Sequence, residues 1–394
     1  MRRRDLLKLA AALPLVFLAP RPIDLFAAPL ASARPRWDRI LLLIELHGGN
    51  DGLNTLVPYA DDRYYQARPR VAIPRERVLQ LSPTVGLHSA LEPLMRVWEA
   101  KELAIVQGVG YPDPNRSHFR SIEIWDTASA SHQVLDDGWL ARVFDRHPLP
   151  AEFPADGILL GPRDCGPLSG RSVRTIVLND PQQLRQQAGR VLPVAPSSTN
   201  RALAHILQVQ QDLTHAATDL TARLQQAPAM QTSFPTSAIG RQLETAARLV
   251  TAGVPVAAIK VSHTGYDTHA GQLGPHERLL KDLAEGVVAF RQAMVQAGLW
   301  ERVLIMTYSE FGRRVSENAS AGTDHGTAAP HLFLGGSVNG GLYGSMPSLA
   351  DLQDGDLKFQ VDYRQLYATV LTHWWKVPAS DVLGGPFPPL HCLS

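Results

Sequence analysis

Short apolar runs recur along the chain and alternate with longer stretches in which apolar residues return every three or four positions. Five of the short runs are rich in β-branched residues; they lie at 40–46, 103–109, 256–261, 303–307 and 331–334. A run that is apolar throughout, rather than at every second position, is typical of a strand with both faces buried. These runs therefore predict the strands of a buried parallel sheet.

The longer stretches predict helices between these strands. Residues 90–100 and 275–298 have the spacing of amphipathic helices, and the second stretch begins with Pro275 and ends with Gly298, where a helix favours them. Strands that alternate with helices indicate an α/β fold, in which helices cover both faces of a mostly parallel sheet. No internal repeat or low-complexity tract interrupts this pattern.

Two regions depart from the alternation. Residues 196–253 contain two long amphipathic patterns, at 200–226 and 237–251, and predict a helical insertion on the sheet. Residues 149–193 are rich in proline and glycine and predict loops with short strands. No linker divides the chain into halves, so we expect residues 34–394 to form a single domain.

The first 33 residues have the layout of an export signal. Basic residues lead into an apolar run at 9–19, and a Pro/Ala-rich stretch with small residues follows. Residues 3–8, RRDLLK, resemble the twin-arginine export motif. The apolar run is shorter than the roughly 20 residues of a membrane-spanning helix. We therefore predict a cleaved signal peptide at 1–33, the twin-arginine export machinery as a partner, and a periplasmic or secreted mature chain without a stable membrane span; an uncleaved tether is the alternative.

The charge and the cysteine content exclude some classes of binding partner and one kind of metal site. The chain has 38 Lys and Arg against 37 Asp and Glu and no run of like charges, which argues against nucleic acid or an anionic membrane surface as a partner. Its two cysteines, Cys165 and Cys392, exclude a four-cysteine zinc site. In an oxidising compartment they either pair or are unrelated.

Polar clusters follow four of the predicted strands. The clusters are HGGNDG at 47–52, GYPDPNRSHFRS at 110–121, SHTGYDTHAGQ at 262–272, and YSEFGRR at 308–314 with TDHGTAAPH at 323–331. Ligands of an open α/β sheet gather at the carboxyl ends of its strands, so we expect these clusters to share one edge. Carboxylates and imidazoles that converge there suit a divalent cation such as Zn, Mn, Mg or Ca.

Each cluster by itself has a simpler interpretation. Asp51 before Gly52 is typical of a turn, and Ser117 before a helix is typical of an N-cap. The chemical interpretation depends on their convergence. A serine at a helix N-terminus is also well placed to attack an anionic ester, because free N–H groups favour negative charge there.

Long motifs resemble a known family. They are LLLIELHGGNDGLNTLVPY, LAIVQGVGYPDPNRSHFRSIEIW, GYDTHAGQ, SEFGRRVSENASAGTDHGTAAPHLFLGG and VDYRQLYATVL. They are similar to the twin-arginine exported bacterial family called domain of unknown function 1501. This family in turn resembles the alkaline phosphatase and sulfatase superfamily, which implies an alkaline-phosphatase-like sheet with metal ligands on the loops at one edge.

The resemblance implies roles for individual residues. Ser117 corresponds to the nucleophile, with Arg116, His118 and Arg313 as substrate-binding residues. The implied metal ligands, for one or two ions, are Asp51, Asp267, His269, Glu310 and His325. In a two-ion site, Asp51, Glu310 and His325 would hold one ion and Asp267 and His269 the other.

Three departures from the superfamily pattern bear on this assignment. In DTH at 267–269 the Asp and His are closer than the usual spacing of three intervening residues, SEFG stands where Asp-His is usual, and the sulfatase signature Cys-x-Pro-x-Arg is absent. The resemblance therefore implies an exported metal-dependent hydrolase of phosphate or sulfate esters that uses serine. The alternatives are a non-catalytic exported binding or assembly protein that keeps the fold, and a transferase that passes a phosphoryl-type group to an alcohol.

Overall fold

A computed structural model describes residues 34–394 except 162–163, 179–217, 221, 228 and 394. The predicted signal peptide and most of the first helical pattern of the insertion lie outside the described residues. Residues 35–394 form one compact unit. None of its described helices is both long and apolar enough to cross a membrane.

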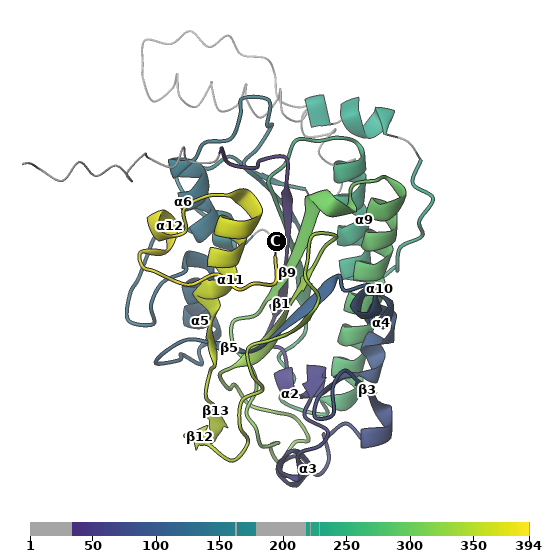
Figure 1. Cartoon of the computed structure of the whole chain (residues 1–394), viewed down its shortest axis with the longest axis vertical. Helices are drawn as coiled ribbons and strands as arrows, with labels where there is room; N and C mark the ends of the chain where they lie inside the picture. Colours follow the sequence, from purple (N-terminus) through teal and green to yellow (C-terminus); the bar gives the residue numbers. More distant parts are fainter. Residues whose placement is uncertain (1–33, 162–163, 179–217, 221, 228, 394) are drawn as a thin grey trace, which may run out of the picture. The chain divides into compact units, whose positions relative to one another are not determined.

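The centre of the unit is a nine-stranded sheet (Figure 1). Its strands are β1 (Ile40–His47), β5 (Leu103–Gly110), β6 (Gly157–Leu160), β7 (Thr175–Val177), β8 (Ala258–Thr264), β9 (Val303–Tyr308), β10 (Ala329–Leu334), β11 (Gly341–Tyr343) and β14 (Val361–Asp362). The strand order is β11-β5-β10-β9-β1-β8-β6-β7, with β14 also paired to β5. Every neighbouring pair is parallel except the two that include β10.

All five predicted strands are present. The direction of β10 differs from the prediction of a parallel strand. This strand runs antiparallel to both β5 and β9, because the segment that joins β9 to β10 stays at one edge of the sheet instead of crossing over a face. The start of β10 therefore lies at the edge where β1, β5, β8 and β9 end. This reversal is what brings residues before β10 to the same edge as the other clusters.

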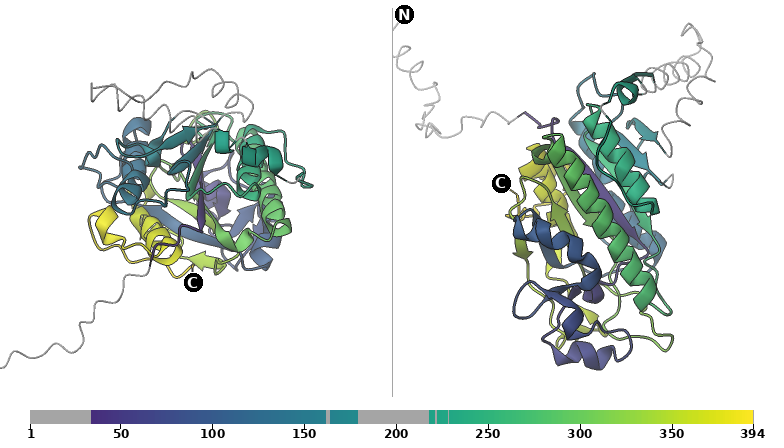
Figure 2. Two further views of the ribbon diagram at one scale, coloured as in Figure 1. Left: turned by 90° about the horizontal axis from the view of Figure 1, so that it is seen from above. Right: turned by 90° about the vertical axis from the view of Figure 1, so that its right-hand side faces the viewer.

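Helices cover both faces of the sheet, as Figures 1 and 2 show. One layer contains η2 (Ser89–Leu94), α4 (Met95–Glu99), α9 (Ala238–Thr251) and α10 (Leu273–Gln296); the other contains α5 (His118–Thr127), α6 (Trp139–Arg146), α11 (Tyr363–Thr369), η5 (Val370–Trp375) and α12 (Ser380–Leu383). Alternate residues of β1 enter the two apolar cores: Leu42 and Ile44 pack under the first layer, and Leu41 and Leu43 under the second. The predicted doubly covered, mostly parallel α/β sheet is confirmed.

The helix boundaries follow local signals. Ser237 precedes α9, and its hydroxyl accepts a hydrogen bond from the Gly240 N–H at 3.3 Å. Gly298, with φ of +68°, follows α10 in the left-handed conformation that often ends a helix. The predicted helix at 90–100 divides into η2 and α4, because Pro93 removes a backbone donor.

Smaller elements surround the sheet edge at which β1 ends. They are α2 (Gly52–Thr55), β2 (Leu56–Val57), α3 (Asp62–Ala67), η1 (Arg75–Arg77), β3 (Val78–Gln80), β4 (Gly86–His88), β12 (Leu352–Gln353) and β13 (Asp356–Leu357). The short elements η3 (Gly166–Leu168) and η4 (Trp300–Arg302) lie elsewhere in the fold. In the region predicted as loops with short strands, β6 and β7 complete one side of the main sheet.

Candidate active site

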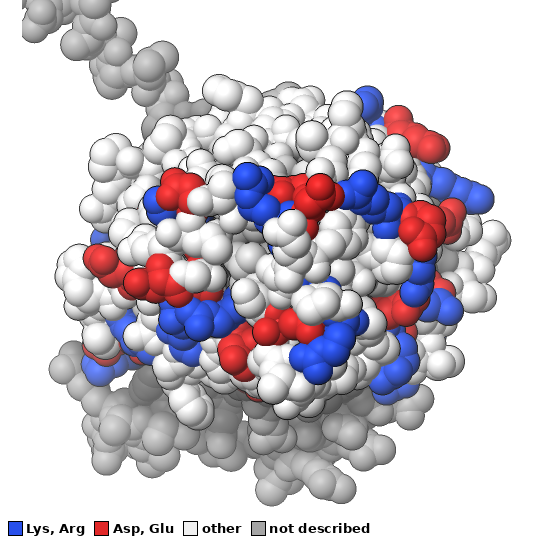
Figure 3. All heavy atoms as spheres, turned by 90° about the horizontal axis from the view of Figure 1, so that it is seen from below, with Lys and Arg blue, Asp and Glu red and all other residues white. Residues whose placement is uncertain are grey.

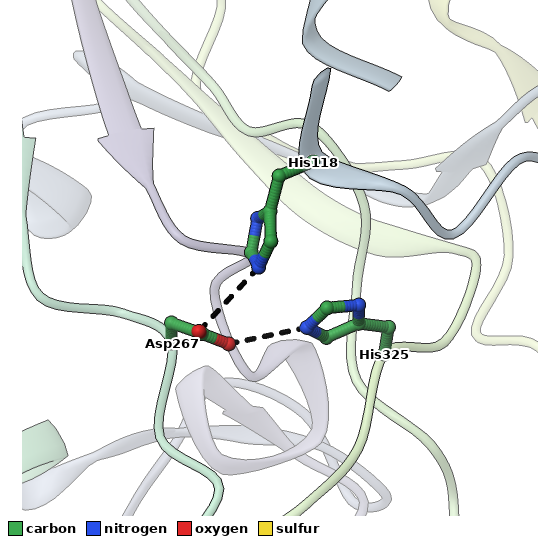
Figure 4. Close-up of side chains that lie close together, drawn as sticks. All are labelled: His118, Asp267 and His325. Atoms are coloured by element: carbon green, nitrogen blue, oxygen red, sulfur yellow. Dashed lines mark hydrogen bonds and ion pairs between the residues drawn. The ribbon is translucent and has the colours of Figure 1, made fainter. Parts of the chain in front are cut away.

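Three loops at one sheet edge bring a cluster of imidazoles around a carboxylate. His118 begins α5 after the β5 loop, Asp267 and His269 follow β8, and His325 precedes β10. Figure 4 shows the rings of His118 and His325 directed at the carboxylate of Asp267. We call these four residues the His/Asp cluster.

The contacts within the His/Asp cluster have the lengths expected between two ligands of one metal ion. Asp267 Oδ1 is 3.0 Å from His269 Nε2 and 3.2 Å from His325 Nε2, and Asp267 Oδ2 is 3.4 Å from His118 Nε2. The Nε2 atoms of His269 and His325 are 2.9 Å apart. Zn–N bonds of about 2.0–2.1 Å place two ligands of one ion roughly 3 Å apart, so these separations fit a shared metal.

The other nitrogen of each ring is hydrogen-bonded to an oxygen acceptor. His118 Nδ1 is 2.9 Å from Glu310 Oε1, His269 Nδ1 is 2.9 Å from Asp324 Oδ1, and His325 Nδ1 is 2.8 Å from the Arg116 carbonyl oxygen. A carbonyl only accepts, so His325 donates through Nδ1–H. The three rings are thus held with Nε2 turned towards Asp267, as in metal sites whose histidines donate their second N–H to an acceptor.

This arrangement suits a cation at its centre. With Nδ1 protonated on both rings, His269 and His325 direct two nitrogen lone pairs at each other across 2.9 Å. A proton or a metal ion between the rings removes that repulsion. The hydrogen bond to Glu310 raises the pKa of His118, whereas burial lowers the pKa of His325 and so favours its neutral, metal-binding form.

Arg313 lies behind the cluster and not against a substrate. Its side chain is fully buried, and its guanidinium donates to the carbonyl oxygens of Gly48, Gly49, Tyr266 and Thr323 and, at 2.6 Å, to Asp267 Oδ1. Partial burial alone would raise the pKa of Asp267, but the hydrogen bond and charge of Arg313 lower it to about 2. The prediction that Arg313 binds substrate is therefore replaced by a role in fixing Asp267 and the loop after β1.

Asp51 lies beneath the cluster, apart from it. It is fully buried, and its Oδ2 accepts hydrogen bonds from Arg68, at 2.7 Å, and from Gln272. Burial opposes ionisation, but the charge of buried Arg68 lowers the pKa of Asp51. Its Oδ1 has no hydrogen-bond partner among the described residues. Because Arg68 already neutralises this carboxylate, the geometry does not favour the predicted metal ligation by Asp51.

Glu310 also differs from its predicted place. Its buried Oε1 accepts from the Gly48 N–H at 2.9 Å and contacts His118 Nδ1, so it supports a ring of the cluster instead of facing its centre. Asp267 and His325, which were divided between two ions in the prediction, form one group with His118, and His269 contacts Asp267 and His325 beside it. A one-ion site therefore fits the described residues better than the two-ion grouping.

The remaining predicted residues border the cluster. Ser117 is the N-cap residue of α5, is exposed, and makes no side-chain cap hydrogen bond. Arg116 pairs with Asp356 and, together with Phe311, lines a cavity of about 510 Å³ next to the cluster. Phe311 stacks on His325 with a ring-centroid distance of 4.4 Å and so separates the cluster from this cavity. Figure 3 shows the corresponding face, where acidic and basic side chains alternate around uncharged surface.

Sequence reasoning missed two roles at this site. It assigned His118 to substrate, although its Nε2 faces Asp267, and it gave no role to Asp324, which holds His269. The sequence feature that could have indicated the role of His118 is its position as the first residue of α5, which directs the ring over the sheet edge. The residue type alone does not distinguish a ligand from a substrate contact.

A family model of proteins of unknown function, DUF1501, matches residues 75–382. The chain is a member of the DUF1501 family. The matched range of this DUF1501 protein includes the whole His/Asp cluster. The predicted family is confirmed, and no curated protein matches the chain.

Several solved structures are similar to this DUF1501 protein. The sulfatase PsFucS1 from Pseudoalteromonas sp. has 10% identity and a TM-score of 0.40, with 90% of this chain and 72% of that one covered. The lipoteichoic acid synthase LtaP from Listeria monocytogenes has 8% identity and a TM-score of 0.36, with 77% and 67% covered. A protein of the alkaline phosphatase superfamily from Vibrio parahaemolyticus has 10% identity and a TM-score of 0.34, with 77% and 62% covered.

Proposed function

We propose that this protein is an exported, metal-dependent hydrolase of phosphate or sulfate esters with one metal site at the His/Asp cluster. The observation that carries the proposal is the pair of Nε2 atoms of His269 and His325, 2.9 Å apart beside the Asp267 carboxylate. A metal ion beside these two atoms would bind both of them, and Nδ1 of each ring is already hydrogen-bonded elsewhere.

The donor set favours Zn²⁺ over Mg²⁺ and Ca²⁺. Three imidazoles and one carboxylate, from His118, His269, His325 and Asp267, suit a borderline cation, whereas Mg²⁺ and Ca²⁺ take oxygen ligands almost exclusively. A bound Zn²⁺ would polarise the ester and neutralise developing negative charge. The buried Glu310 and Arg313 keep the ligands in position, so little reorganisation is needed when the ion binds.

Ser117 is the nucleophile in this proposal. Its hydroxyl is exposed, makes no cap hydrogen bond and precedes the ligand His118 directly, at the N-terminus of the ten-residue helix α5. Free N–H groups there favour an anionic group next to the serine. Arg116, on the other side of Ser117, has a partly exposed guanidinium that can contact ester oxygens while it remains paired with Asp356. Residues 1–33 act as the export signal in the same proposal and place the mature domain in the periplasm or outside the cell.

The test combines elemental analysis with an ester screen. The purified wild type should contain about one Zn²⁺ per chain and hydrolyse p-nitrophenyl phosphate, bis(p-nitrophenyl) phosphate or p-nitrophenyl sulfate. His269→Ala and His325→Ala should lose both metal and activity, Ser117→Ala should lose activity and keep metal, and the exposed control His132→Gln should keep both.

Two results would contradict the proposal in different ways. A protein that lacks metal even after incubation with Zn²⁺, and whose variants behave like the wild type, would overturn the metal site. A protein that binds one Zn²⁺ but hydrolyses none of the esters would leave the site standing and support the non-catalytic binding alternative.

A further inference from the structure

A charged residue lies in the middle of the most apolar strand of the sheet. Glu45 belongs to β1, its side chain is only 2% exposed, and Ile44 and Leu46 flank it. A carboxylate in such a place costs free energy unless charges and hydrogen bonds satisfy it. The His/Asp cluster makes no use of Glu45, so its own partners indicate its role.

The two oxygens of Glu45 have different partners. Oε2 accepts a hydrogen bond from the Ser262 hydroxyl at 2.7 Å and lies 3.0 Å from Nζ of Lys260, which is also buried. Oε1 lies 3.0 Å from Nδ1 of His47, the last residue of β1. Burial alone would raise the pKa of Glu45, but the hydrogen bond with His47 and the charge of Lys260 lower it to about 2. Glu45 is therefore an ionised carboxylate with one oxygen directed at His47.

His47 is the last residue of β1, so it lies at the sheet edge that carries the proposed active site. Its side chain is 51% exposed, and among the described residues no hydrogen bond to its Nε2 is found. The next residue, Gly48, donates its N–H to the same Glu310 oxygen that His118 contacts. The carbonyl oxygen of His47 accepts from Tyr266, the residue before Asp267, at 3.1 Å. The backbone of His47 is thus connected on both sides to residues that hold the His/Asp cluster.

We propose that His47 is the general acid that protonates the leaving oxygen of the ester, and that the protein consequently acts on esters of unactivated alcohols. This inference rests on the proposed hydrolase function. In the step, a nucleophilic oxygen bonds to phosphorus or sulfur and loses its proton to solvent. The bond to the leaving oxygen breaks with its electron pair on that oxygen, which takes the proton from Nε2. The products are the alcohol, a phosphorylated or sulfated Ser117 that water hydrolyses in a second step, and a neutral imidazole, which solvent protonates again.

The environment of His47 suits this role. An alkoxide leaves poorly unless it is protonated, and a positioned acid typically contributes about 10²–10⁴-fold to such a step. The pKa of His47 is raised above its ordinary value, chiefly by the hydrogen bond to Glu45, with the charge of Glu310 adding to the effect while partial burial and Lys260 oppose it. The protonated form that an acid requires is therefore more stable than in a free imidazole.

The kinetic test compares two leaving groups on the Zn²⁺-loaded protein. For the ester class that the wild type hydrolyses, kcat/KM is measured for the p-nitrophenyl ester, whose leaving group needs no proton, and for the matching alkyl ester. His47→Gln should lose about 100-fold or more on the alkyl ester and less than about 10-fold on the aryl ester. The exposed His132→Gln is the matched control and should lose nothing on either.

A second measurement does not depend on turnover. NMR titration of the metal-free protein measures the pKa of the His47 ring. This pKa should be lower in Glu45→Gln than in the wild type, because the variant lacks the carboxylate that contacts Nδ1. Elemental analysis of His47→Gln should still give one Zn²⁺ per chain, because His47 is not a ligand in this proposal.

The outcomes separate the two proposals. If the wild type hydrolyses both esters and His47→Gln loses equally on both, or if the pKa of His47 is the same with and without Glu45, the general-acid role is overturned and the hydrolase function stands. If the Zn²⁺-loaded wild type hydrolyses neither ester, the hydrolase function is overturned together with this inference.

Discussion

Two polar regions lie at the same sheet edge and contain the same kinds of residue, yet they have different roles. In the His/Asp cluster the side chains are partly exposed; the ligand atoms of His118, Asp267 and His325 lie within 4.8 Å of one another, and His269 Nε2 is 3.0 Å from Asp267 Oδ1. In the region beneath it, Asp51, Arg68 and His276 are fully buried and bind protein partners. We call this second group the buried network.

The buried network has opposite charges and hydrogen bonds of its own. Arg68 donates to Asp51, to the Asn54 side chain and to two backbone carbonyls, and His276 Nε2 is 3.0 Å from Asn50 Oδ1. Its charges cancel within the protein, which makes it a structural element. The His/Asp cluster instead presents three imidazole Nε2 atoms around one carboxylate, a set of ligands that suits an added cation. The two regions contain the same residue types; what distinguishes the His/Asp cluster from the buried network is that its imidazole Nε2 atoms receive no hydrogen bond from a Lys or Arg side chain of the described residues.

The largest effect is expected at the centre of the cluster. His325→Ala removes a ligand whose Nε2 faces both His269 and Asp267. The affinity for Zn²⁺ should fall by more than the roughly 10–100-fold that the loss of an outer partner causes. Competition with a chelator of known affinity measures this change. If the variant binds Zn²⁺ with wild-type affinity, His325 is not a ligand and its role is structural, like that of the buried network.

The opposite pattern is expected in the buried network. Asp51→Asn leaves the Arg68 charge buried without a partner and should lower the free energy of unfolding by about 3–5 kcal/mol. The protein that remains folded should bind Zn²⁺ with wild-type affinity. Denaturant unfolding and the chelator assay on the same sample test both statements, and loss of Zn²⁺ binding without loss of stability would restore Asp51 as a ligand.

Glu310 lies between the two regions and should show an intermediate effect. Glu310→Gln keeps the shape of the side chain but weakens the acceptor for His118 Nδ1, so Zn²⁺ affinity should fall by about 10–100-fold. The matched control is Asp324→Asn, which changes the exposed carboxylate behind His269. Solvent competes at that position, so its loss of affinity should be smaller. An equal loss in the two variants would show that burial of the supporting carboxylate is unimportant.

The smallest effect is a pH dependence that belongs to the buried network. Burial lowers the pKa of His276 to about 4, from about 6.5 in an unfolded chain. Between these values the unfolded state takes up a proton and the folded state does not, so the stability is complete above about pH 6.5 and is lost as the pH falls. By about pH 4.5 this residue should account for a loss of about 2 kcal/mol. Urea unfolding at several pH values should show a weaker dependence in His276→Gln than in the wild type, and an unchanged slope would contradict it.

The strands and the edge of the site could be predicted from sequence because burial on both faces leaves a local pattern. A strand such as β1 must be apolar along its length, and the polar residues after it must then lie at its carboxyl end. The direction of β10 could not be predicted, because its apolar run is the same for a parallel and an antiparallel strand. The prediction of the family rested on long motifs and is independent of these local patterns.

By itself, the sequence determined the family, the doubly covered sheet and the set of loops in which chemistry was to be sought. Only the tertiary structure decided which of their residues meet. It grouped His118, Asp267 and His325 with His269 beside them, and it paired Asp51 with Arg68 and Arg313 with Asp267. The physical reason is that a carboxylate or an imidazole has the same chemistry wherever it lies in the chain. Its role depends on whether another charge of the protein lies within bonding distance, and residues distant in sequence supply that charge.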